Sequence, residues 1–150
     1  MGTWRAIAGA AATAIAIAAA GCGGSDDETS AAEALTKTEF IAQADEICAS
    51  GDAEIAAASQ ELGPSPTPEE VTQLVTDVAL PAVQEQRDSI AALGAPEGDE
   101  DEVKAILDGL DEAIAVVEAD PEAAAGSTGN PFAEVGRLAQ AYGMTDCGNS

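Results

Sequence analysis

The sequence predicts an all-α fold: a small up-and-down bundle of about four helices, closed by one disulfide and preceded by a signal peptide and a flexible tether. Apolar residues recur at helical spacing in four segments after residue 36, and no segment alternates like a β-strand. Prolines and glycines separate these segments by short connections, so each helix must bury its apolar stripe against the others. Cys48 and Cys147 lie near opposite ends of this region.

The first 35 residues have the composition of an export signal and a tether. Arg5 precedes an apolar run over residues 6–20, and small residues follow it, which predicts a signal peptide over residues 1–21. The next residue, Cys22, resembles the lipobox cysteine of bacterial lipoproteins. That resemblance implies that Cys22 carries acyl chains such as palmitate and becomes the mature N-terminus. Residues 22–35 are Gly, Ser, Thr, Ala, Leu and acids, which is typical of a flexible tether.

Two alternatives to a lipid anchor remain open at the N-terminus. Cleavage after Ala20 would release a soluble protein beginning at Gly21. A spanning helix is the other alternative, although the apolar run is shorter than the roughly 20 residues that a bilayer core requires. The number of cysteines favours lipidation, because the chain has three and lipidation of Cys22 leaves Cys48 and Cys147 as a pair.

The first helix is expected between Thr36 and Gly63. Thr36 and Glu39 have the spacing of a capping box, and Gly63 suits a C-terminal cap. The predicted buried stripe repeats every three, four or seven residues. Its members are Phe40, Ala44, Ile47, Cys48, Ile55, Ala58 and Leu62.

The second helix is expected between Thr67 and Gly94. Thr67 is the N-cap, Pro68 takes the first helical position and Glu70 the third. Pro81 lies inside this helix, and its ring crowds the carbonyl of Asp77, which predicts a kink or a break into two shorter helices. The predicted stripe is Val71, Leu74, Val75, Val78, Ala82, Ile90 and Leu93.

Two further helices complete the predicted bundle, which occupies residues 36–150. The third begins at Asp99, with Glu102 completing its cap, and ends at Asp120-Pro121. Residues 123–129 are expected to be a loop or a frayed turn. The fourth helix begins at Asn130-Pro131 and ends at Gly143. Their stripes are Val103, Ile106, Leu107, Leu110, Ile114 and Val117, then Phe132, Val135, Leu138 and Tyr142.

Export and position predict a disulfide between Cys48 and Cys147. Disulfides persist outside the cytoplasm, and Cys48 lies on the apolar stripe of the first helix. Closing a loop of about 100 residues stabilises a domain by about 4.7 kcal/mol in the chain-entropy treatment. The alternative is a buried free thiol at Cys48 and an incidental Cys147 in the tail.

Composition restricts the chemistry that the chain can perform. Loss of residues 1–21 removes Arg5 and no acid, so the formal net charge of −23 becomes −24. Such a chain repels nucleic acid and anionic lipid, so membrane attachment has to come from the acyl chains on Cys22. The chain contains no histidine, so the usual base of serine and cysteine nucleophiles is missing. We expect no catalytic residues, no metal site and no cofactor.

Two acidic features have ordinary structural explanations. The acids within residues 97–102 lack the spacing of a calcium loop and suit a solvated helix start. Asp45 is expected to bond a helix end or a basic side chain such as Arg87 or Arg137. The alternative is a polar residue in a ligand groove.

Several segments together resemble a group of small lipoproteins of high-GC bacteria. They are residues 40–48, Pro81, residues 93–96 and 130–132, and Tyr142-Gly143 shortly before Cys147. The resemblance implies a helical domain on the extracytoplasmic side of the cell membrane and no established activity. We therefore expect a lipid-anchored helical module of the envelope that binds another envelope protein or a small ligand. A passive structural surface lipoprotein is the alternative, and an enzyme with an unrecognised carboxylate site is the last.

Overall fold

The computed structural model describes residues 34–126 and 129–149, and within these residues every regular element is helical. The predicted all-α class is therefore confirmed. The elements are α1 (Lys37–Glu61), α2 (Pro68–Leu74), the π-helical turn η1 (Val75–Ala79), α3 (Leu80–Leu93), α4 (Glu100–Ala119), α5 (Pro121–Ala125), α6 (Ala133–Tyr142) and the 3-10 turn η2 (Cys147–Asn149).

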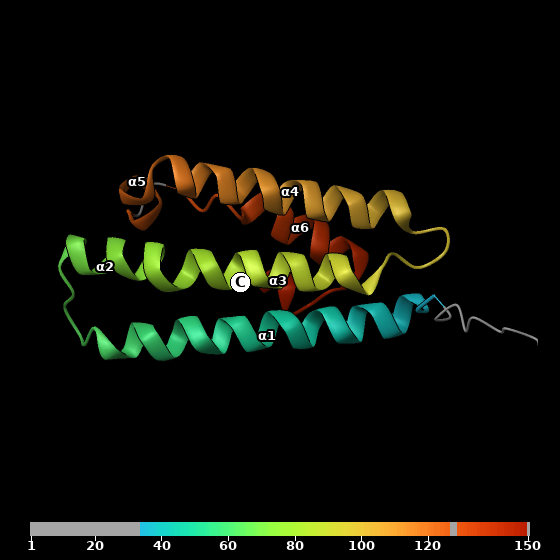
Figure 1. Ribbon diagram of the computed structural model, residues 1–150, viewed down its shortest axis with the longest axis horizontal. Helices are drawn as coiled ribbons and strands as arrows, with labels where there is room; N and C mark the ends of the chain where they lie inside the picture. The colour runs from blue at the N-terminus through green and yellow to red at the C-terminus, as the bar shows by residue number, and fades with distance from the viewer. Residues whose placement is uncertain (1–33, 127–128, 150) are drawn as a thin grey trace, which may run out of the picture. The chain divides into compact units, whose positions relative to one another are not determined.

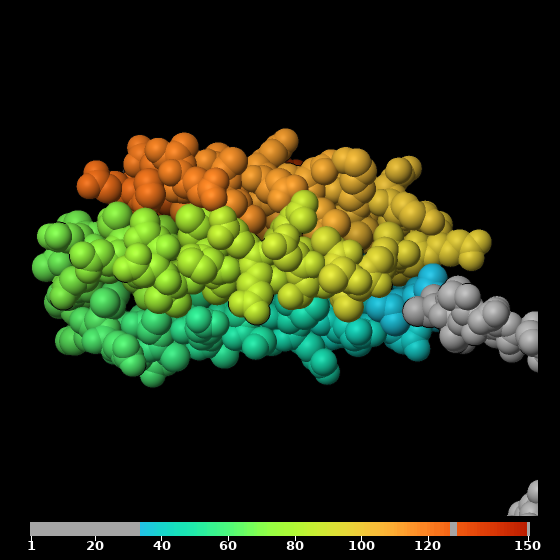
Figure 2. Space-filling model, viewed as in Figure 1, coloured from blue at the N-terminus to red at the C-terminus, as the bar shows by residue number. Residues whose placement is uncertain are grey.

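The helices form an antiparallel bundle (Figure 1). Helix α1 runs in one direction, α2, η1 and α3 return as one rod, and α4 runs parallel to α1 on the other side of that rod. Helix α6 packs on α4, and η2 bridges α6 to α1. Figure 2 shows the side chains of α1, α3 and α4 in continuous contact along one face, with α3 in the middle. This is the up-and-down bundle that the sequence predicts.

Two of the three predicted N-terminal capping boxes form as expected. The Thr36 side chain accepts a hydrogen bond from the backbone N–H of Glu39, whose carboxylate accepts one in return from the Thr36 N–H at 3.0 Å. Thr67 and Glu70 make the same reciprocal pair. The cap predicted for Asp99 is wrong. Asp99 occupies the N-cap position of α4 without capping it, because its carboxylate accepts a hydrogen bond from the Tyr142 hydroxyl at 2.9 Å.

Pro81 is accommodated without a break in the rod. The chain stays helical from α2 through η1 into α3, and the N–H of Leu80 bonds back to the carbonyl of Val75. Because proline lacks an N–H and its ring crowds the preceding turn, a wider π-helical turn just before it relieves the conflict. The alternative prediction, a break at Pro81 into two separate helices, is therefore wrong. The sequence did not reveal the π-helical turn.

The segment after α4 differs from the prediction in two places. Residues 121–125 form the short helix α5, which takes in the first three residues of the loop or frayed turn expected over residues 123–129. The Asp120 carboxylate caps this helix by accepting a hydrogen bond from the N–H of Ala123 at 2.9 Å. Helix α6 begins at Ala133 and not directly after Pro131. Asn130 instead forms a tight turn, in which its side-chain oxygen accepts a hydrogen bond from the backbone N–H of Phe132 at 2.9 Å. The predicted C-cap is confirmed, since Gly143 has a φ of 116°.

The core lies where α1, α3, α4 and α6 meet. Phe40 and Ala44 on α1 are fully buried, and the rings of Phe40 and Tyr142 form a T-shaped pair with a centroid distance of 6.0 Å. At the surface, Arg87 on α3 binds both carboxylate oxygens of Asp111 on α4 at 2.7 Å each. Across residues 34–126 and 129–149, no helix has the length and apolar character needed to cross a bilayer.

Candidate functional site

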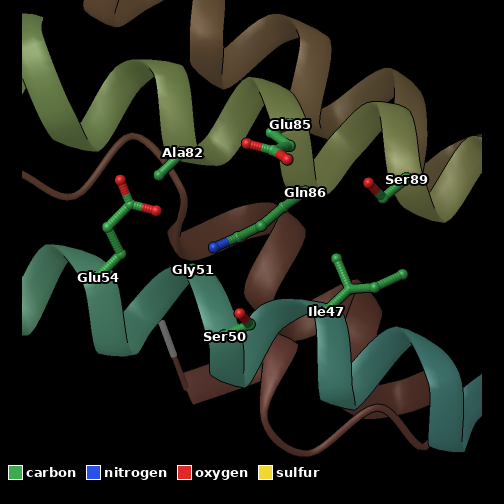
Figure 3. Close-up of a pocket in the computed structure, with 8 residues that line it drawn as sticks. All are labelled: Ile47, Ser50, Gly51, Glu54, Ala82, Glu85, Gln86 and Ser89. Atoms are coloured by element: carbon green, nitrogen blue, oxygen red, sulfur yellow. The ribbon is translucent and has the colours of Figure 1, made fainter. Parts of the chain in front are cut away.

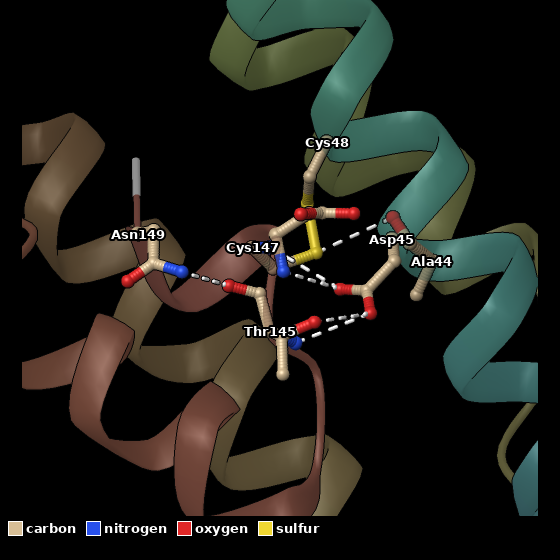
Figure 4. The surroundings of a disulfide bond; sticks show 7 residues. Ala44, Asp45, Cys48, Thr145, Cys147 and Asn149 are labelled. Atoms are coloured by element: carbon tan, nitrogen blue, oxygen red, sulfur yellow. Dashed lines mark hydrogen bonds between the residues drawn. A yellow bond between two sulfur atoms is a disulfide. The ribbon is translucent and has the colours of Figure 1, made fainter.

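The predicted disulfide between Cys48 and Cys147 is present, and it joins α1 to the C-terminal tail across 99 residues of sequence (Figure 4). Cys48 is buried, as its place on the apolar stripe predicts. The Sγ of Cys147 lies 3.3 Å from the carbonyl oxygen of Ala44. Since a disulfide sulfur carries no proton, this approach is a close contact and not a hydrogen bond. The predicted lipidation site, Cys22, lies outside the described residues.

Asp45 fastens the same tail beside the disulfide (Figure 4). Its carboxylate accepts the backbone N–H groups of Thr145, Asp146 and Cys147 at 3.1, 3.0 and 3.3 Å. These groups precede and begin η2, so the interpretation that Asp45 bonds a helix end is confirmed. The two arginines considered as partners pair elsewhere, Arg87 with Asp111 and Arg137 with Glu134.

An apolar cavity of about 230 Å³ lies inside the bundle next to the disulfide. All four long helical segments and the tail contribute to its walls, and most of the side chains are apolar. The lining residues are Cys48, Asp52, Ile55, Ala79, Val83, Gln86, Ile90, Ile106, Leu110, Phe132, Val135, Ala139, Met144 and Cys147. Asp52 and Gln86 are the polar members of this set.

A second apolar cavity, of about 240 Å³, continues along the rod. It shares Ala79, Val83 and Phe132 with the first and extends toward α5 and Pro131. Ala79 is the last residue of the π-helical turn, so the turn that relieves Pro81 also shapes the wall common to both cavities. Two neighbouring apolar cavities with common wall residues thus lie alongside α3.

Gln86 is the one polar side chain that is buried in the described part of the chain, with 7% of its surface exposed. Its Nε2 has no hydrogen-bond partner among the described residues. The side chain extends from α3 toward Gly51 on α1 (Figure 3). It also lines a shallow outer groove of about 190 Å³ between these helices, together with Ile47, Ser50, Gly51, Glu54, Ala82, Glu85 and Ser89. Gln86 therefore stands in the wall between the outer groove and the inner cavity.

Gln86 is not among the site residues predicted from the sequence, although the sequence contains a signal for it. Ala82 and Ile90 are predicted core residues, and Gln86 lies four residues from each, on the same helical face. A polar residue on an apolar stripe indicates either a buried hydrogen bond or a ligand contact. The pairing of Gln86 with Gly51 has no such signal, because it depends on how α1 and α3 pack.

A second polar cluster closes the end of the bundle where α1 begins. The ammonium of Lys37 lies 3.8 Å from the centre of the Tyr142 ring and 3.5 Å from Asp99 Oδ2. Burial raises the pKa of Tyr142, and its hydrogen bond to Asp99 raises it further. Tyr142 therefore keeps its hydroxyl proton and donates a hydrogen bond to Asp99, which suits a structural link between the start of α4 and the end of α6.

No protein-family model, no curated protein and no solved structure matches this chain. The described residues contain no cluster of three or more histidine, cysteine or acidic side chains placed to hold a metal ion. What the inner cavity accepts is therefore inferred from its own shape and chemistry.

Proposed function

We propose that this protein is a lipid-anchored, extracytoplasmic binding module that takes up a small, mainly apolar molecule between its helices. The observation that carries the proposal is the inner cavity of about 230 Å³ with walls made largely of aliphatic and aromatic side chains. An apolar cavity of about 150 Å³ is enough to bind benzene. The cavity is therefore large enough for a ligand somewhat bigger than one aromatic ring.

The N-terminal sequence supports the location. The charged start, the apolar run and Gly21-Cys22 are typical of a lipoprotein signal, and residues 22–35 are suited to hold the domain away from the membrane. The confirmed disulfide is consistent with an oxidising compartment. With an acidic mature chain, acyl chains on Cys22 are the proposed link to the membrane.

A passive structural lipoprotein of the cell surface is the second candidate. The feature that favours it is the charge, since a formal net charge of −23 keeps a protein soluble and separate from its neighbours. An envelope protein as partner would need a docking face rather than a cavity. Our proposal assigns no catalytic role.

Calorimetric titration with toluene tests the binding proposal. The mature chain from residue 22, with Cys22→Ser to keep it in solution, is expected to bind one toluene saturably. Ala79→Leu extends a side chain into the cavity wall and is expected to weaken that binding at least tenfold. Ala42→Leu makes the same change at an exposed position of α1 and is the matched control. Absence of saturable binding by the parent chain would contradict the proposal.

A further inference from the structure

We infer that the ligand is a single unbranched hydrocarbon tail with an uncharged polar head, long enough to occupy both apolar cavities. This inference rests on the proposed function and adds the chemical class and the length of the ligand. It is carried by two cavities of similar volume, about 230 and 240 Å³, which share the wall residues Ala79, Val83 and Phe132.

The residues common to the two cavities include one large side chain. Ala79 and Val83 are four residues apart, so they lie on the same face of the helical rod, and both side chains are short. Phe132 occupies the N-cap position of α6 and is only partly buried against the core. In the proposed complex the Phe132 side chain turns aside, and the two cavities form one elongated site.

The apolar stripe of the rod is incompletely buried along the second cavity. No residue of α2 or η1 is buried, although these elements carry the first half of the stripe that the sequence predicts. Val75, Leu80 and Val83 line the second cavity, and each is only partly buried. Since removal of apolar surface from water is favourable in proportion to its area, a hydrocarbon tail that covers these side chains gains affinity.

The volumes and the lining residues set the length of the tail and the charge of the head. Scaling from benzene in about 150 Å³ gives about nine non-hydrogen atoms in each cavity and about eighteen in both. A charged head would lose its hydration among mainly apolar side chains. No basic side chain is among the residues that line the two cavities, and the protein is strongly acidic, so an anionic head is disfavoured further.

Two unbranched alcohols of different length test whether the ligand spans both cavities. By size, 1-octanol fits one cavity and 1-dodecanol has to enter both. We expect calorimetry on the mature chain with Cys22→Ser to give 1-dodecanol an affinity about tenfold or more above that of 1-octanol, because each buried methylene adds to binding. Ala124→Leu fills part of the second cavity without touching the inner one and is expected to abolish most of this gain. Ala115→Leu makes the same change at an exposed position of α4 and is the matched control.

The outcomes separate this inference from the proposed function. If 1-octanol binds the parent and 1-dodecanol binds no more tightly, the ligand is confined to one cavity, and the inference is wrong while the binding function stands. The inference is also wrong if Ala124→Leu keeps the full gain from 1-octanol to 1-dodecanol. If neither alcohol binds the parent, both the inference and the proposed function are wrong. Dodecanoate tests the head group, and binding as tight as that of 1-dodecanol would overturn the assignment of an uncharged head.

Nuclear Overhauser effects locate the bound tail without any variant. Met144 lines the inner cavity and not the second, and Val117 lines the second and not the inner one. We expect protons near opposite ends of bound 1-dodecanol to contact these two side chains. Contacts with only one of the two side chains would overturn the inference.

Discussion

The amide of Gln86 occupies the space that a side chain at Gly51 would need. A Cβ at position 51 would stand 1.8 Å from Nε2 and 2.9 Å from Cγ of Gln86. Glycine inside a helix costs about 1 kcal/mol relative to alanine. Here that cost is offset by the close approach of α1 and α3, which lets the Gln86 amide pack against the backbone of Gly51.

We expect Gly51→Ala to destabilise the protein by about 1–2 kcal/mol, because the amide must leave its place in a packed interior. In a Gln86→Ala background the clash is absent, and the same change is expected to be neutral or to stabilise by up to about 1 kcal/mol. Urea unfolding of the parent, both single variants and the double variant measures this coupling. Equal effects of Gly51→Ala in the two backgrounds would show that the residues do not depend on each other.

The tail depends on Asp45 as well as on the disulfide. Asp45→Asn leaves one carbonyl oxygen where two carboxylate oxygens accept three backbone N–H groups. We expect a loss of about 1–3 kcal/mol in unfolding free energy and faster hydrogen exchange at Thr145 and Cys147. Glu46→Gln removes the same charge from an exposed neighbouring position and is the control. Unchanged exchange in the tail of Asp45→Asn would contradict this assignment.

The disulfide is expected to supply a large part of the stability. It closes 99 residues of sequence, and the core that it supports contains few large rings. The double variant Cys48→Ala, Cys147→Ala is expected to lose about 2–5 kcal/mol. Thermal melting followed by circular dichroism, with and without reductant, measures the loss. If the double variant melts at the same temperature as the oxidised parent, packing alone stabilises the bundle.

Local rules of sequence predicted most of the fold. The capping boxes at Thr36 and Thr67 and the C-cap at Gly143 depend on residues at fixed spacing, so sequence reveals them. The cap predicted at Asp99 does not form, because a contact with a residue distant in sequence overrides the local rule. Its partner, Tyr142, lies 43 residues away in sequence, and their hydrogen bond arises only when α6 packs beside α4.

The candidate site was harder to predict than the fold. The cysteine pair followed from the number of cysteines and from export. The cavity did not, because its walls come from four helical segments and the tail, and its shape depends on the π-helical turn before Pro81. Gln86 could be recognised as a polar residue on an apolar stripe. The contact of Gln86 with Gly51 could not, since nothing in the sequence sets the distance between α1 and α3.

The capping box of α2 gives a pH-dependent contribution to stability. Hydrogen bonds from the backbone N–H and then the hydroxyl of Thr67 lower the pKa of Glu70 from 4.5. A lowered pKa in the folded state means that the ionised carboxylate stabilises the fold above pH 4.5, and that this stabilisation is lost as the pH falls through the folded value.

Glu70→Gln removes this titration while a glutamine can still complete a capping box. We therefore expect the stability of the parent relative to Glu70→Gln to fall as the pH is lowered below 4.5, and to stay constant near neutral pH. Urea unfolding over a series of pH values measures the difference. Glu69→Gln removes a charge from the same turn outside the capping box and is the control. A difference independent of pH would contradict the assigned cause.

The last prediction concerns the proposed membrane anchor, which depends on the sulfur atom of Cys22. If Cys22 carries the acyl chains, Cys22→Ser in the full chain is expected to move the protein from the membrane fraction to the soluble or secreted fraction. The acidic chain has no basic patch to hold it at an anionic bilayer, so no second attachment should remain. Cys48→Ala, Cys147→Ala is the matched control, because it removes cysteines without touching position 22 and should stay with the membrane. Mass spectrometry that finds an unmodified mature chain beginning at Gly21 would show that the protein is secreted and not anchored.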